Sequence, residues 1–462
     1  MALQQLKVGA AKRCISPTPD MLPMPNMRGS YTDVRTGEDL MVRAIVIDNG
    51  ERVFLLESWE LAAVPCDVEL RESIEQRYGI KQENMLLFGT HNHHSPFVAG
   101  SGAPKTSDSN SGPDAQVQDN TRRFTELVKE MSLEVVGAAM EGMRPARYGY
   151  GEGKSYINVN RDQFYFEGYW MQGINFEGCS DKTLAMIKFV DDEGKLIAAL
   201  MNYAMHSNTS FCSLDADGKM KVTSDIPGIA CNFVEEYFGN DAVVMWQSGA
   251  AGNQNPYYMG GMSYYDKTGT VRMRDRINGA GYEQAVVFGQ QHAIDAIRVL
   301  KGIENVKPGM RITTVDSTIY FPGQTFPENV DRAAHRVMVD NLQEWAGQIP
   351  FGAPMPEKHL VDMIPSDKKV PMKAQLVLLG DIAIYGVACE LYNEIAVLCK
   401  EASPFKHTMV ATHIGTPSVG YVLDDASKDK KVFQSFGAVH PGQSNGIVVN
   451  GMLDMFEEAL AK

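Results

Sequence analysis

Three pairs of apolar segments, each divided by a short polar turn, constrain the fold of this chain more than any other feature. The pairs span residues 42–56, 185–205 and 376–389, and the turn of the first contains Asn49-Gly50. Asn-Gly favours a tight turn between antiparallel strands. Each pair therefore predicts a β-hairpin, and three hairpins argue against a purely parallel sheet.

Outside the hairpins, apolar residues recur at helical spacing. These stripes lie near residues 70–78, 124–135, 282–300, 328–346 and 391–400. Spacings of three and four residues mark the buried face of an amphipathic helix. Strands that alternate with helices indicate an α/β or α+β fold. We expect mixed β-sheets between helical layers in a single domain over residues 1–462, and we find no clear internal repeat.

The composition limits which partners this chain can have. Apolar residues make up 44% and charged residues 22% of the chain, as in ordinary globular proteins. The 57 acidic residues exceed the 43 Lys and Arg, and the net charge of −14 disfavours binding to nucleic acid or an anionic membrane. We expect a small-molecule substrate and no membrane partner, and a homo-oligomer stays open.

Other features favour a cytoplasmic location. The N-terminal residues 1–7 lack the apolar core of a secretion signal, and no apolar run approaches the roughly 18 residues of a transmembrane helix. The chain has seven cysteines and no CxxC pair. An odd number without paired spacing is typical of reduced thiols.

A histidine cluster directly follows one apolar run. Residues 85–88 read as a buried strand, and His91, His93 and His94 come next. In an extended chain, residues i and i+2 point to the same side, about 6–7 Å apart. His91 and His93 can therefore face one pocket, where one ring would hold a metal and the other would move a proton. The alternative is a polar loop in which the histidines cluster by chance.

Two more potential ligands follow predicted strands. His206 comes after the second hairpin, and Glu390 comes after the third. Two imidazoles and a carboxylate form a known catalytic zinc set that leaves positions open for water or substrate. The three residues are dispersed, however, and either His206 or Glu390 alone is more often a structural polar residue.

Several short motifs, in order, resemble the N-terminal catalytic domain of the neutral/alkaline ceramidase family. They cover most of the chain, from about residue 8 to residue 437. The matching segments are Val8–Pro17, Met27–Tyr31, Gly89–His93, Asn158–Arg161, Asn202–His206, Ala251–Pro256, Cys389-Glu390 and Gly420–Val422.

The resemblance implies roles for individual residues. One zinc ion would be held by His91, His206, Glu390 and Tyr421. His93 would be the general base for the attacking water, and Arg161 with Tyr421 would stabilise the charge on the attacked carbonyl oxygen. We also expect His94, Gln254, Asn255 and Phe436 to contact the substrate, although His94 could instead coordinate the metal.

The chain also departs from the family pattern. Asn255 stands where the family has a serine, which excludes an acyl-enzyme route through that position. His94-Ser95-Pro96-Phe97 replaces a Ser-Gly-Pro-Gly segment, and a second family tyrosine corresponds to Phe433 or Phe436. We also expect the family's C-terminal immunoglobulin-like domain to be missing. We therefore expect the fold and the metal site to carry over, but not ceramide as the substrate.

These features predict a zinc-dependent hydrolase that cleaves a carbon–nitrogen amide bond of a small soluble N-acyl compound. The alternative is a metal-dependent lyase or acid/base enzyme that acts on a polar, sugar-like molecule. A third hypothesis is a metal-stabilised binding protein, against which His93 and Arg161 argue.

Two other segments have more than one interpretation. Residues 257–265 are aromatic and glycine-rich, and they form either a lid or a surface loop. Gly442–Gly446 fits GxSxG, but His440-Pro441 precedes it instead of the buried strand that a nucleophile elbow needs.

Overall fold

The computed structural model describes most of the chain. The described residues are 4–26, 29–98, 115–165, 169–211, 213–259, 263–265, 271–273, 280–322, 369–416, 419–428, 430, 432, 434, 438–439 and 442–462. The predicted helix at 328–346 and the predicted substrate contact Phe436 lie outside these residues.

The first predicted hairpin belongs to a unit of four strands and one helix. Strands β4 (Met41–Asp48) and β5 (Val53–Trp59) form the hairpin, and β1 (Lys7–Cys14) pairs antiparallel with β4. Helix α1 (Asp67–Tyr78) then returns the chain to β6 (Met85–Gly89), which pairs parallel with β5. The strand order is β6-β5-β4-β1, and the two-residue strand β7 (Arg144–Pro145) extends the β1 edge.

The other two hairpins belong to units with the same order and the same pairing. The second unit contains β8 (Arg147–Lys154), β11 (Thr183–Val190), β12 (Leu196–Tyr203), α3 (Asp225–Tyr237) and β14 (Val243–Ser248). The third contains β18 (Ile312–Phe321), β19 (Val370–Leu379), β20 (Ile382–Val387), α6 (Asn393–Ala402) and β22 (His407–Ala411).

The sequence shows no clear repeat, but the fold contains one, so the expectation of no repeat is wrong. Each sheet is a three-stranded antiparallel meander followed by a helix and one parallel strand. The sequence conceals this repeat because sheet topology requires apolar faces and turns, and many different side chains satisfy both requirements.

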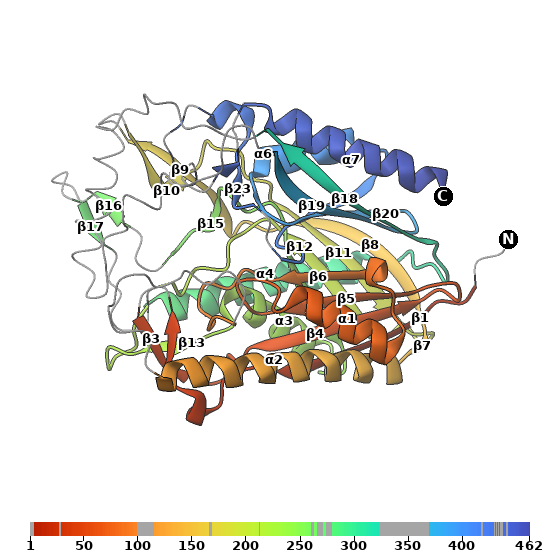
Figure 1. Ribbon diagram of the computed structural model, residues 1–462, viewed down its shortest axis with the longest axis horizontal. Coiled ribbons are helices and arrows are strands. Elements are labelled where there is room, and N and C mark those ends of the chain that lie inside the picture. Colours follow the sequence, from red (N-terminus) through yellow and green to blue (C-terminus); the bar gives the residue numbers. More distant parts are fainter. Residues whose placement is uncertain are drawn as a thin grey trace.

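The three sheets share one apolar core. Residues from all three units meet there, among them Phe88, Leu200 and Ile384, which are 0% exposed. The opposite face of each sheet is covered by a helix pair: α1 with α2 (Ala115–Glu141), α3 with α4 (Ala280–Gly302), and α6 with α7 (Ser444–Ala461). In Figure 1, α2 runs along the lower edge and α7 along the upper edge. The predicted mixed sheets between helical layers are confirmed.

The remaining strands lie outside the three units. They are β2 (Met24–Asn26), β3 (Gly29–Val34), β9 (Asn158–Tyr165), β10 (Tyr169–Asn175), β13 (Met220–Val222), β15 (Gln254–Pro256), β16 (Ser263–Tyr265), β17 (Val271–Met273), β21 (Glu390–Leu391), β23 (Tyr421–Val422) and β24 (Ala438–Val439). Part of the segment proposed as a lid is β16, which pairs with β17. None of the described helices has the length and apolarity needed to cross a bilayer.

A buried carboxyl group lies between the first sheet and its helices. Glu57 on β5 is 0% exposed, and neither of its side-chain oxygens has a hydrogen-bond partner within the described residues. Burial raises its pKa well above the usual value, and the charge of Arg71 opposes this only in part. Glu57 is therefore protonated in the folded protein under conditions that ionise it in the unfolded chain.

We expect Glu57→Gln to stabilise the protein increasingly as the pH rises. Because the folded pKa exceeds the unfolded value of about 4.3, Glu57 destabilises the fold progressively as pH rises toward the folded pKa. Gln cannot ionise, so the variant should gain on the parent from about pH 4.5 upward, by about 1.4 kcal/mol for each pH unit until the folded pKa is reached. Urea unfolding of both proteins, with a chelator present throughout, measures the difference. A difference that does not change with pH would contradict the assignment.

Candidate metal centre

The site forms where the parallel strands of the three units end. Ser248 Oγ, at the end of β14, donates to the Thr90 carbonyl after β6 at 3.1 Å. The Thr412 amide, after β22, donates to the Ser248 carbonyl at 2.9 Å, and the Gly89 amide donates to the His413 carbonyl at 3.2 Å. These hydrogen bonds join the three strand ends, and we call them the strand-end ring.

Each unit contributes one potential ligand beside this ring. His91 comes two residues after β6, whereas His206 and Glu390 each come three residues after the second strand of their hairpins. His91 Nε2 lies 3.1 Å from His206 Nε2 and 3.5 Å from Glu390 Oε2. His206 Nε2 lies 3.1 Å from the same carboxylate oxygen. The structure thus brings together three residues that are up to 299 positions apart.

Backbone carbonyls determine which nitrogen each ring presents. His91 Nδ1 lies 3.1 Å from the Ala62 carbonyl, and His206 Nδ1 lies 2.6 Å from the Ala251 carbonyl. A carbonyl can only accept a hydrogen bond, so both Nδ1 atoms carry the proton. With Nε2 unprotonated, as metal binding requires, the lone pairs of both rings face each other and a carboxylate.

This donor set fits a metal cation. Lone pairs that face each other across about 3 Å repel unless a positive charge lies between them. For zinc, a ligand distance of about 2.0–2.1 Å in a tetrahedron places neighbouring ligand atoms about 3.3 Å apart, which matches the observed 3.1–3.5 Å. Metal-ligating histidines typically donate their other ring nitrogen to a carbonyl, as both rings do here.

His93 lies against the same cluster. Its Nε2 is 3.0 Å from His91 Nε2, and the ligand atoms of His91, His93 and His206 all lie within 4.8 Å of one another. Burial, followed by the charges of His91 and His206, lowers the pKa of His93 well below its usual value. His93 is therefore a neutral imidazole that can accept a proton.

The backbone that brings His91 and His93 together is not an extended strand end. His91 has φ of 58°, in the left-handed region. The His93 amide donates to the Ser207 carbonyl at 2.9 Å, and Asn92 forms a bridge with the same residue. A tight turn after β6 thus brings the two rings together. His91 and His93 face one site, as predicted, but the extended backbone that was expected between them is wrong.

Arg161 and Tyr421 lie next to each other, and Tyr421 pairs with Glu390 across β23 and β21. Arg161 Nη2 donates to the Gly252 carbonyl at 2.5 Å and lies 3.2 Å from the Tyr421 hydroxyl. Arg161 Nη1 donates to Asn255 Oδ1 at 3.2 Å, and that oxygen also accepts from Asn208 Nδ2 at 3.0 Å. The side chain of Asn255 therefore holds the buried guanidinium.

The neighbours of Glu390 and Tyr421 determine the protonation state of each group. Burial raises the pKa of its carboxyl group, but His91 and His206 more than offset this and hold it well below the usual value. Burial and then the Glu390 charge raise the pKa of Tyr421. Glu390 is therefore ionised and Tyr421 carries its proton, which makes the phenol a hydrogen-bond donor.

The remaining predicted contacts lie in different surroundings. The Gln254 carbonyl accepts from the His206 amide at 3.2 Å, while its side-chain Nε2 donates to the Cys179 carbonyl at 2.9 Å. The His94 ring is 0% exposed and packs edge-on against Tyr31 and Tyr282. Their contact with a substrate stays a prediction.

The site contains one histidine, His413, that the sequence-based prediction did not include. His413 stacks on His91 with ring centroids 3.8 Å apart and an interplanar angle of 13°. Thr412-His413 follows β22 just as Thr90-His91 follows β6. The repeated Thr-His after an apolar strand was a signal in the sequence that could have identified it.

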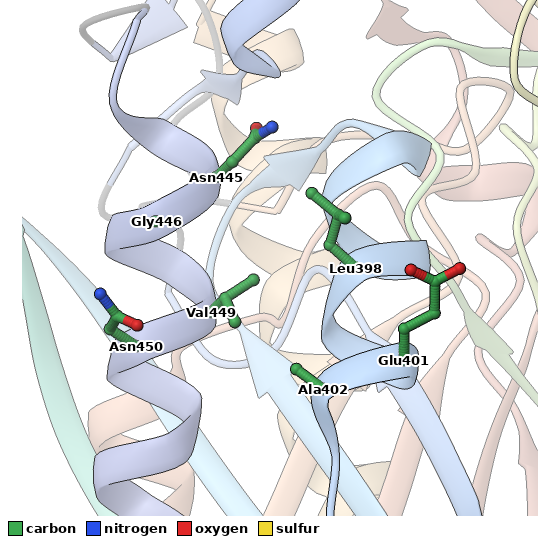
Figure 2. A pocket seen from close by; sticks show the side chains of 7 residues that line it. All are labelled: Leu398, Glu401, Ala402, Asn445, Gly446, Val449 and Asn450. Atoms are coloured by element: carbon green, nitrogen blue, oxygen red, sulfur yellow. The ribbon is translucent and has the colours of Figure 1, made fainter.

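A surface groove lies away from this centre. It runs between α6 and α7, and Figure 2 shows its lining residues Leu398, Glu401, Ala402, Asn445, Gly446, Val449 and Asn450. Two of these residues belong to the GxSxG segment. Ser444 is the first residue of α7 and is buried, so it is not presented on an elbow after a buried strand.

Solved structures with a similar fold include neutral ceramidases. Neutral ceramidase from Pseudomonas aeruginosa matches with a TM-score of 0.67 and 14% identity, over 98% of this chain and 74% of that chain. The chain has the neutral-ceramidase fold. A ceramidase complexed with C2 matches with a TM-score of 0.64 and 14% identity, over 98% and 75% of the two chains. No family model matches this chain, and no curated protein matches it in sequence.

We expect the histidines of this neutral-ceramidase fold to differ in their effect on metal binding. His206→Ala removes a ligand and should weaken binding of a divalent metal by more than roughly 100-fold, beyond the loss that follows removal of an outer partner. His93→Gln should retain the metal, because His91, His206 and Glu390 remain. Metal content and competition with a chelator measure both, with half-buried His407→Ala on β22 as the control. Equal loss of metal in His93→Gln would make His93 a ligand.

Proposed function

We propose that this protein is a zinc-dependent hydrolase that cleaves a carbon–nitrogen amide bond of a small N-acyl compound. The observation that carries the proposal is the compact set of His91, His206 and Glu390, with a neutral imidazole on one side and a guanidinium on the other. The similarity of the fold to neutral ceramidases supports an amide substrate.

The donor set supports zinc among the divalent metals. Two imidazoles and one carboxylate are a known catalytic zinc set, and the observed spacing suits a tetrahedron. When bound, zinc would supply a Lewis acid and would lower the pKa of a water molecule toward about 7. In this proposal His91, His206 and Glu390 hold the ion, and Tyr421, which pairs with Glu390 across β21 and β23, completes the set or contacts the substrate.

His93 accepts the proton of the attacking water. Its pKa is depressed, so it is neutral at physiological pH and has a nitrogen free to take a proton. The Ser207 carbonyl fixes its backbone, which keeps the ring beside His91. After the carbon–oxygen bond forms, His93 returns this proton to the leaving nitrogen as the carbon–nitrogen bond breaks.

Arg161 and Tyr421 stabilise the negative charge that develops on the substrate carbonyl oxygen. The guanidinium is held by the Gly252 carbonyl and by Asn255, so little reorganisation is needed during the reaction. Asn255 offers a carboxamide where the resembled family has a serine. A covalent acyl intermediate at this position is therefore not part of the proposal.

We expect His93→Gln to lower kcat by about 100- to 10,000-fold while the protein still binds zinc. The assay would use a panel of short N-acyl amines and N-acyl amino acids, with release of the free amine as the readout. His407→Ala is the matched control and should keep the parent rate. Full activity in His93→Gln would contradict the general-base role.

Reaction in oxygen-18 water separates hydrolysis from the lyase alternative. Hydrolysis should place one labelled oxygen in the product carboxylate, because the attacking oxygen comes from water. An unlabelled product, or an unsaturated one, would contradict the proposal and favour elimination.

Arg161→Lys tests the electrophilic side of the site. Lys keeps the charge but cannot contact Gly252, Asn255 and Tyr421 together, because it lacks the planar fork of the guanidinium. We expect kcat to fall roughly 100-fold, as when one oxyanion donor is lost, with little change in KM. A change confined to KM would assign Arg161 to substrate binding instead.

A further inference from the structure

His413 is a buried imidazole of the metal centre that the proposed mechanism does not use. It occupies the same place in the third unit as His91 does in the first, two residues after the parallel strand. Both residues have left-handed backbones, with φ of 58° at His91 and 57° at His413. Such a backbone is uncommon for residues other than glycine, although His, Asn and Asp adopt it more readily than most.

The contact between the two residues is made by the faces of their rings. The stack is nearly parallel, at 3.8 Å and 13°. His413 is 4% exposed, and its Nε2 has no hydrogen-bond partner in the part of the chain that the structure describes. The strand-end ring fixes the His413 backbone, since its carbonyl accepts from the Gly89 amide.

His91 needs a second constraint of this kind. Its hydrogen bond to the Ala62 carbonyl, at 3.1 Å, restrains rotation about the Cβ–Cγ bond, but a single hydrogen bond still tolerates tilting of the ring. The direction of Nε2, which faces His206 and Glu390, depends on the ring plane. A flat neighbour at stacking distance limits this tilt.

We propose that His413 is a positioning residue that holds the plane of the His91 ring and thereby sets the affinity and geometry of the metal centre. This inference rests on the metal site of the proposed function. It predicts that the flat ring of residue 413 matters, while its nitrogen atoms do not.

Two variants separate the ring from the backbone. His413→Asn removes the ring but retains a residue that tolerates a left-handed backbone. His413→Phe retains a flat ring but suits this backbone less well. If residue 413 positions His91, Phe should preserve metal binding despite a loss of fold stability, and Asn should weaken metal binding despite a stable fold.

The measurements are zinc affinity by competition with a chelator, the visible spectrum of the cobalt-loaded protein, and thermal unfolding of the metal-free protein. We expect His413→Asn to weaken zinc binding roughly 10- to 100-fold, the usual effect of losing an outer partner of a metal ligand, and to alter the cobalt bands. His413→Phe should bind zinc within a few-fold of the parent and keep the parent spectrum.

Three outcomes would overturn the inference. Parent-like zinc affinity and cobalt bands in His413→Asn would remove the positioning role. Equal weakening in both variants would show that the histidine nitrogens or the backbone matter, not the stacked ring. Absence of zinc binding by the unsubstituted protein would overturn the proposed function itself, which is a distinct result.

Discussion

Hydrogen bonds between the ends of β6, β14 and β22 hold the three sheet-and-helix units of this protein in register. The strand-end ring uses the main chain of Gly89, Thr90, Ser248, Thr412 and His413, and one hydroxyl group from Ser248. Buried amides and carbonyls need partners, and here each unit satisfies groups of its neighbour. The metal centre sits beside the ring, so its geometry depends on all three units packing correctly.

The same arrangement explains how polar ligands are held in a buried site. Removing imidazoles and a carboxylate from water is costly unless each atom finds a partner. Carbonyls of Ala62 and Ala251 satisfy Nδ1 of His91 and His206, so Nε2 of each ring is the nitrogen that faces the site. A cation bound here would compensate the lone pairs and the charge of Glu390. The centre is thus prepared by the backbone as much as by its side chains.

Three units with the same topology carry different side chains at corresponding places. Three residues after the second hairpin strand, the first unit has Ala62, the second His206 and the third Glu390. Two residues after the parallel strand, the first and third units have His91 and His413, and the second has Ala250. A repeated scaffold therefore supports an asymmetric site. Ala62 contributes a carbonyl oxygen to His91, and the side chain of His413 contributes a ring face that stacks on His91.

The sequence alone determined the local elements and the types of ligand. Apolar pairs around polar turns specified the three hairpins, helical stripes specified α1, α2, α4 and α6, and the ordered motifs pointed to His91, His206 and Glu390. These features depend on near neighbours in the chain. Tertiary structure decided the features that depend on residues far apart in the chain. These are the threefold repeat of the fold, the left-handed turn at His91, the hydrogen bond between Arg161 and Asn255, and the stacking of His413 on His91. Each of these arises from packing between units, where hydrogen bonds and ring contacts join residues that no local pattern relates.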